Sequence, residues 1–209
     1  MHARRDRLLR IARMAAALLP LLLLWPALRH AVESRMLTHM LLEWPLLFAA
    51  GWAAQKRLGP RLPRIGRALA ALDWRGWSSA TFVSCVAIFW MLPSAIDAAL
   101  LLAPMAAAKY LSWWLAGAAM AAGWRRMDPE LLLFFVGNLA WMSATAGMLY
   151  LDTPARLCVS YLLDDQRWTG TGLIVLALGL GGMALRRVLQ AGGTGRETAE
   201  GPRARPGQA

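Results

Sequence analysis

Histidine, carboxylate and thioether side chains recur near the ends of apolar stretches in this 209-residue chain. His39 and Glu43 are four residues apart, so a helix would place them on one face. Met36 and Met40 have the same spacing on the adjacent stripe. An imidazole beside thioethers could bind a soft metal ion such as Cu(I). The same imidazole beside a carboxylate could instead lock two helices together by hydrogen bonding or handle protons, so three interpretations stay open.

A second set of such residues follows later in the chain. The stretch Met91-Leu92-Pro93 precedes Asp97, and the proline predicts a helix kink that frees a backbone carbonyl close to this carboxylate. Met91 alone is an ordinary packing residue, and it becomes a candidate thioether ligand only beside a histidine. Asp165 precedes the last apolar stretch, where an acid could either cap a helix or supply a further ligand.

The elements that carry these residues are long apolar stretches. Hydrophobic residues make up 58% of the chain, more than the core of a soluble domain of this size requires. The stretches lack the alternation of a membrane β-barrel, and lipid cannot satisfy open backbone amides, so each is predicted to be a helix. A bilayer is crossed by about 20 helical residues. The sequence thus predicts an all-α integral membrane protein with six transmembrane helices, near 11–29, 37–54, 77–101, 104–124, 130–151 and 169–187.

Basic residues set the orientation of these helices. With the N-terminus in the cytoplasm, inside segments hold 18 of the 23 lysines and arginines, and outside segments hold 5. The positive-inside rule therefore predicts that both termini lie in the cytoplasm. We expect a multi-pass protein of a bacterial inner membrane. The net charge of +11 is spread between apolar stretches rather than along one face, which argues against nucleic-acid binding.

The predicted organisation has three parts. Residues 1–10 form a basic cytoplasmic N-terminus, 11–187 form the helical bundle, and 188–209 form a disordered cytoplasmic tail. Within the bundle, the loop 55–76 is expected to contain a helix lying on anionic headgroups. The two cysteines have no metal-type spacing and predict no disulfide framework.

Four segments of the chain form a pattern together. They are Arg35–Leu42 followed by Pro45 and Gly51, Trp90–Leu100, Gly147–Pro154, and Asp165-Gln166 with Gly170. Over roughly residues 34–185 they resemble the CtaG family of cytochrome c oxidase assembly factors. The first resembles the family's His-Met-x-x-His-Met-Leu-Leu helix, and the second resembles its Trp-His-Leu-Pro-x-x-Tyr-Asp-x-Ala-Leu stretch. The last resembles its Asp-Gln-Gln-x-x-Gly motif, and the third resembles the segment that leads to this motif.

The chain departs from this family at its histidines. Arg35 and Met91 stand where the family has histidine, and the histidine-rich stretch maps near 105–117, where this chain has Lys109-Tyr110. Of those histidines, only His39 is present. The resemblance implies a non-enzymatic factor that helps to mature the copper-containing part of a haem–copper terminal oxidase from the periplasmic side. The alternative is an accessory transmembrane subunit of a respiratory or other membrane complex that has lost metal binding.

The expected partners are haem–copper oxidase subunits or another respiratory membrane complex, together with lipid, with anionic lipids at the cytoplasmic face and no nucleic acid. Copper is the expected metal. The candidate ligands, with the histidine and the thioethers binding directly and the acids supporting them, are His39, Met91, Met36, Met40, Asp97, Glu43 and Asp165.

Overall fold

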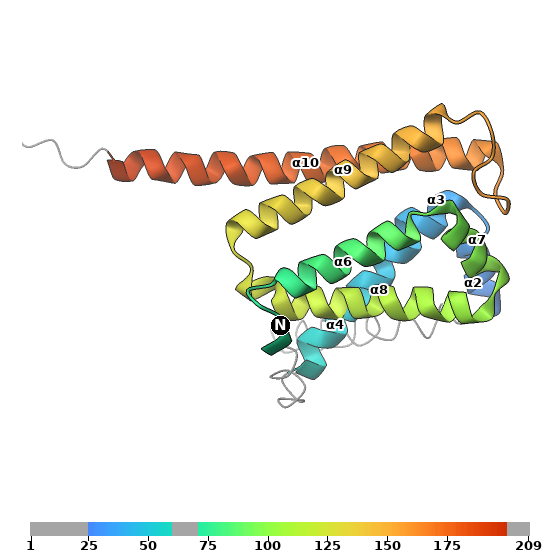
Figure 1. Ribbon diagram of the computed structural model, residues 1–209, viewed down its shortest axis with the longest axis horizontal. Coiled ribbons are helices and arrows are strands. Elements are labelled where there is room, and N and C mark those ends of the chain that lie inside the picture. Colours follow the sequence, from blue (N-terminus) through green and yellow to red (C-terminus); the bar gives the residue numbers. More distant parts are fainter. Residues whose placement is uncertain (1–24, 60–70, 200–209) are drawn as a thin grey trace, which may run out of the picture.

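The computed structural model describes residues 25–59 and 71–199, and every regular element in these ranges is a helix (Figure 1). This part of the structure confirms the predicted all-α class. The elements are α2 (Pro26–Glu33), α3 (Met36–Thr38), the π-helix η1 (His39–Glu43), α4 (Trp44–Leu58), α6 (Trp77–Trp90), α7 (Pro93–Leu101), α8 (Ala103–Gly123), the 3-10 helix η3 (Trp124–Arg126), α9 (Pro129–Asp152) and α10 (Leu163–Ala199).

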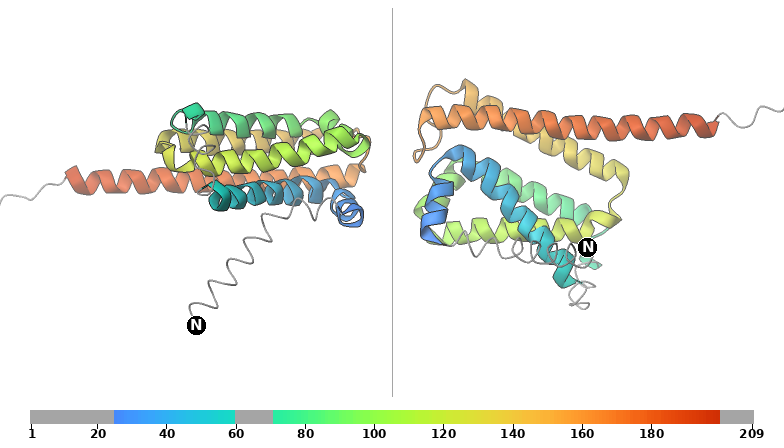
Figure 2. Two further views of the ribbon diagram at one scale, coloured as in Figure 1. Left: turned by 90° about the horizontal axis from the view of Figure 1, so that it is seen from below. Right: turned by 180° about the vertical axis from the view of Figure 1, so that it is seen from behind.

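Two close helix pairs organise the described chain. The helices α4 and α8 cross where Gly51 faces Trp114 and Gly117 faces Phe48, and a Cβ atom on either glycine would collide with a backbone carbonyl. The helices α9 and α10 lie side by side, with Gly147 and Gly170 at their contact (Figures 1 and 2). Small residues allow such close approach of membrane helices, so both pairs depend on glycine.

The predicted kink before Asp97 is confirmed. The helices α6 and α7 are separated by Met91 and Leu92 and meet at a bend of 77°. Pro93 begins α7, where its missing amide hydrogen costs nothing. The carbonyl of Met91 accepts a hydrogen bond from the Tyr150 hydroxyl at 3.3 Å, which ties the bend to α9.

Two of the described helices are long and apolar enough to cross a membrane, Pro129–Asp152 and Leu163–Gln190, and the bent pair α6–α7 adds a third if it counts as one span. Large apolar side chains cover the outer faces of α9 and α10, including Phe134, Trp141 and Leu178, which are about 70% exposed. Such exposed apolar faces are typical of helices that lie in a membrane or against a partner protein. The first of the six predicted spans lies mostly outside the described residues.

The tail differs from its prediction. Residues 188–199 were expected to belong to a disordered segment, but α10 continues to Ala199. Residues 163–199 contain no proline, and the next one is Pro202, so no residue of α10 lacks the amide hydrogen that a helical hydrogen bond needs. The rest of the predicted tail, the basic N-terminus and most of the predicted interfacial helix lie outside the described residues.

Segments predicted to share a side of the membrane lie together. The elements α2, α3 and α7 and the connection between α9 and α10 gather at one end of the molecule (Figure 1). The segment just before α6, which carries Arg75, and the connection from α8 to α9, which carries Arg125 and Arg126, lie at the opposite end. These two ends correspond to the predicted outer and cytoplasmic faces.

Candidate functional site

A buried group of ionisable side chains lies at the predicted outer end, and we call Glu33, His39, Glu43 and Lys109 the charge cluster. Its centre is the Lys109 ammonium, whose side chain is fully buried. The Nζ atom donates to Glu33 Oε1 at 2.6 Å, to His39 Nε2 at 2.9 Å and to Glu43 Oε2 at 3.0 Å. An ammonium has three hydrogens, so all its donors are used.

Local helix geometry brings His39 and Glu43 together. They are the first and last residues of the π-helix η1, and their side chains approach to 3.5 Å between Nε2 and Oε2. Single π-turns inside α-helices are rare and occur frequently at functional sites.

Glu33 links the cluster to two further side chains. Its Oε2 accepts from Arg29 Nε at 2.8 Å, one helical turn earlier in α2, and its Oε1 also accepts from the Tyr110 hydroxyl at 3.2 Å. Arg29 and Lys109 are the cations, and the two glutamates are the anions, so the group is electrically balanced when the histidine is neutral. Balance of this kind is what a buried charge requires.

The hydrogen bonds of His39 identify its tautomer. The Tyr161 hydroxyl donates its single hydrogen to the Glu33 backbone carbonyl at 2.9 Å, so it must accept from His39 Nδ1, 2.6 Å away. Burial raises the pKa of Tyr161 well above its usual value, which keeps this hydroxyl protonated. With the proton on Nδ1, His39 presents the Nε2 lone pair to the Lys109 ammonium.

Tyr161 is positioned by a loop, residues 153–162, that two other candidate segments hold. Asp97 of α7 accepts from the backbone amides of Val159 at 2.9 Å and Ser160 at 3.1 Å. Gln166 of α10, which is almost fully buried, accepts from the Leu157 amide at 2.8 Å and donates to the Tyr150 carbonyl at 3.2 Å. Asp97 and Gln166 thus support the hydroxyl that orients the imidazole.

The structure brings together only some of the predicted ligands. Among the described residues, the histidine, cysteine and acidic side chains that could share one ion are Glu33, His39 and Glu43. Asp97 is not in this group, because its carboxylate binds loop amides. Asp165 is also outside it and is half-buried in the first turn of α10.

The methionines lie in apolar surroundings. Met36 and Met40 are buried in the hydrophobic core, and Met91 packs against that core at the α6–α7 bend. No hydrogen bond joins their sulfur atoms to the charge cluster within the described residues, and ligation by these thioethers stays a prediction.

Sequence reasoning missed Glu33 and the role of Lys109. Glu33 lies at the end of α2, in a segment expected to be an outer connection, and spacing gave no reason to pair it with a residue 76 positions away. Lys109 carried a usable signal, since a lysine inside a predicted span requires a buried acidic partner.

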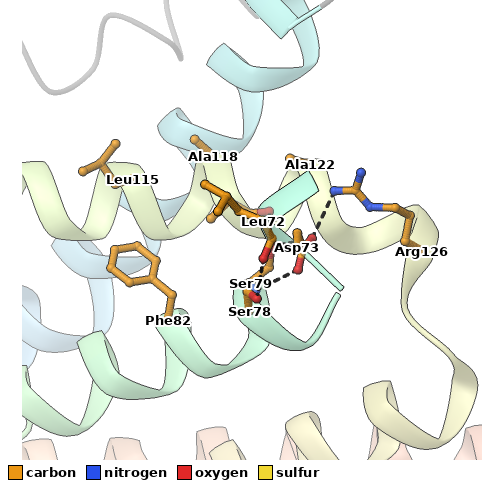
Figure 3. Close-up of a pocket in the computed structure, with 10 residues that line it drawn as sticks. Leu72, Asp73, Ser78, Ser79, Phe82, Leu115, Ala118, Ala122 and Arg126 are labelled. Carbon is orange, nitrogen blue, oxygen red and sulfur yellow. Dashed lines mark hydrogen bonds and ion pairs between the residues drawn. The ribbon is translucent and has the colours of Figure 1, made fainter. Parts of the chain in front are cut away.

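A hollow lies at the predicted cytoplasmic end, between α6 and α8 (Figure 3). It has a volume of about 290 Å³, and apolar side chains such as Phe82 and Leu115 form its walls. At its polar edge, Asp73 accepts from Ser79 Oγ at 2.9 Å and from Arg126 at 3.1 Å. These contacts join the N-terminal end of α6 to the C-terminal end of α8, so the edge acts as a brace between them.

Comparison with protein-family models, curated proteins and solved structures found no match to this chain. The fold and the charge cluster therefore carry the argument about what this protein does, together with the motifs of the sequence.

Proposed function

We propose that this chain is a six-helix inner-membrane protein that assists assembly of a copper-containing haem–copper terminal oxidase from the periplasmic side. The observation that carries the proposal is the buried histidine–carboxylate group at the predicted outer end. His39 lies in the segment that resembles the family's histidine helix, and it is oriented through a loop held by Asp97 and Gln166. The loop 153–162 thus links the segments that resemble the family, since Asp97 and Gln166 bind its amides and its Tyr161 binds His39.

The proposal assigns no chemical reaction to the chain. The Tyr161 hydroxyl beside His39 already donates its hydrogen to the Glu33 carbonyl, and Lys109 is fully engaged with acids and an imidazole. Its role is to hold α2, η1 and α8 in a fixed arrangement at the face that would meet a client subunit.

An accessory subunit without metal is the second candidate, and one observation favours it. The position between Glu33, His39 and Glu43 is filled by the Lys109 ammonium. A permanent subunit would co-purify with respiratory subunits in constant ratio after mild detergent extraction. An assembly factor would be found with incomplete oxidase and would be missing from the mature enzyme.

A deletion strain tests the proposal. We expect the haem–copper oxidase spectrum and its oxygen consumption to be lost while copper-free oxidases continue to work. Wild-type chain should restore both signals, and His39→Gln should restore them poorly. Cys85→Ser, which changes a residue outside the charge cluster, is the matched control. Unchanged oxidase spectrum and activity in the deletion strain would refute the proposal.

A further inference from the structure

The charge cluster has the layout of a metal site with a cation already at its centre. Glu33, His39 and Glu43 each direct one donor atom inward, and these atoms lie within 4.8 Å of one another. Lys109 Nζ is 2.6 to 3.0 Å from an atom of each. The three donor atoms thus surround the Nζ atom as ligands surround a metal ion. Their distances to Nζ are those of N–H hydrogen bonds and are longer than metal–ligand bonds.

The imidazole is prepared as a ligand would be. A metal-binding histidine commonly donates its second ring nitrogen to an oxygen, which fixes the tautomer and points the other lone pair at the ion. His39 does this through Tyr161, and its Nε2 lone pair faces Lys109. The distance of 3.5 Å between His39 Nε2 and Glu43 Oε2 is also close to the ~3.4 Å that separates two ligands of tetrahedral Zn²⁺.

Copper as implied by the family resemblance does not fit this arrangement. Cu(I) prefers sulfur ligands, whereas the donors here are one nitrogen and carboxylate oxygens, a set suited to Zn²⁺ and similar divalent ions. The ammonium of Lys109 also occupies the place of the ion, and the two anions of the group are already balanced by Lys109 and Arg29. A further divalent cation would have to displace the ammonium.

We propose that the Lys109 ammonium is a covalently tethered substitute for a metal ion, and that shortening this side chain exposes a divalent-cation site formed by Glu33, His39 and Glu43. The substitute keeps the helices together without dependence on metal supply. This inference concerns the chain alone, so it can fail while the role in oxidase assembly stands, and the reverse also holds.

Zn²⁺ and Co²⁺ titrations of metal-stripped protein in detergent test the inference. Lys109→Ala should melt lower than wild type without metal, and Zn²⁺ should raise its melting temperature by about 5 °C or more, the shift expected for about a hundredfold excess over the dissociation constant. Co²⁺ should give a visible absorption band of a tetrahedral site in Lys109→Ala. Wild type should show neither effect.

The double variant Lys109→Ala/His39→Gln is the matched control, since it has the same cavity without the imidazole. A Zn²⁺ shift of equal size in wild type or in the double variant would overturn the inference. If Lys109→Ala folds only when Zn²⁺ is supplied during expression, the inference is supported. If it folds in neither condition, Lys109→His replaces it, and a folded Lys109→His protein without a Co²⁺ band would overturn the inference.

Discussion

Removal of the charge on Lys109 is the perturbation whose size the structure defines best. Lys109→Met keeps nearly the same length and volume but leaves Glu43 without a cation, while Glu33 retains Arg29. Breaking a buried ion pair in this way costs about 3–5 kcal/mol, because one charge stays buried without its partner. For a chain of this size about 1 kcal/mol shifts the melting temperature by about 2–4 °C, so we expect a drop of roughly 6–20 °C.

The double variant Lys109→Met/Glu43→Gln separates this cause from simple loss of packing. It removes the unpaired anion, and replacing a buried pair by neutral groups of similar volume is often close to neutral, so most of the lost stability should return. Thermal melts in detergent measure all variants, with Lys56→Met at the exposed end of α4 as the matched lysine control. The reasoning is refuted if Lys109→Met melts within about 2 °C of wild type, or if the double variant melts no higher than the single one.

Three further predictions concern packing and the outer loop. Gly117→Ala should destabilise the protein by about 1–3 kcal/mol, because the new methyl group meets the backbone of α4, whereas Gly137→Ala, with open space around it, should be neutral or stabilising in thermal melts. Burial and the nearby Asp97 raise the pKa of Cys158 to about 12, so roughly one thiol in ten thousand is ionised at pH 8. In a Cys85→Ser background, a water-soluble maleimide should therefore label Cys158 at pH 8 only after unfolding. Asp97→Asn weakens the hydrogen bonds to the loop amides and removes the negative charge beside Cys158, so the labelling rate of Cys158 should rise at least about tenfold. An unchanged labelling rate would contradict the role of Asp97 as the anchor of the loop.

The helical class and the break in the third predicted span could be read from the sequence, because both depend on local chemistry. Long apolar stretches require helices in lipid, and Pro93 cannot donate the hydrogen bond that would continue α6. The prediction of where α10 ends was wrong. A polar, glycine-rich composition predicts disorder, but no helix-breaking proline occurs between the start of α10 and position 202. The composition of that segment indicates a tendency to disorder but does not determine its conformation.

The candidate site was predicted in part for a similar reason. His39 and Glu43 are neighbours along one helix, so their spacing was sufficient to pair them. Glu33 and Lys109 are 76 residues apart, and their contact arises from the tertiary fold, which brings the end of α2 to a side chain of α8. Spacing cannot report such a contact. The rule that a charge within a membrane span needs a counter-charge would have led from Lys109 to the glutamates.

The metal content of wild-type protein, purified in mild detergent from cells supplied with copper and zinc, tests the central claim most directly. The claim is that the Lys109 ammonium holds the place of an ion between Glu33, His39 and Glu43. Elemental analysis should find no stoichiometric copper or zinc in wild type and close to one zinc per chain in Lys109→Ala. One metal ion per chain in wild type that is lost in His39→Gln would contradict the claim.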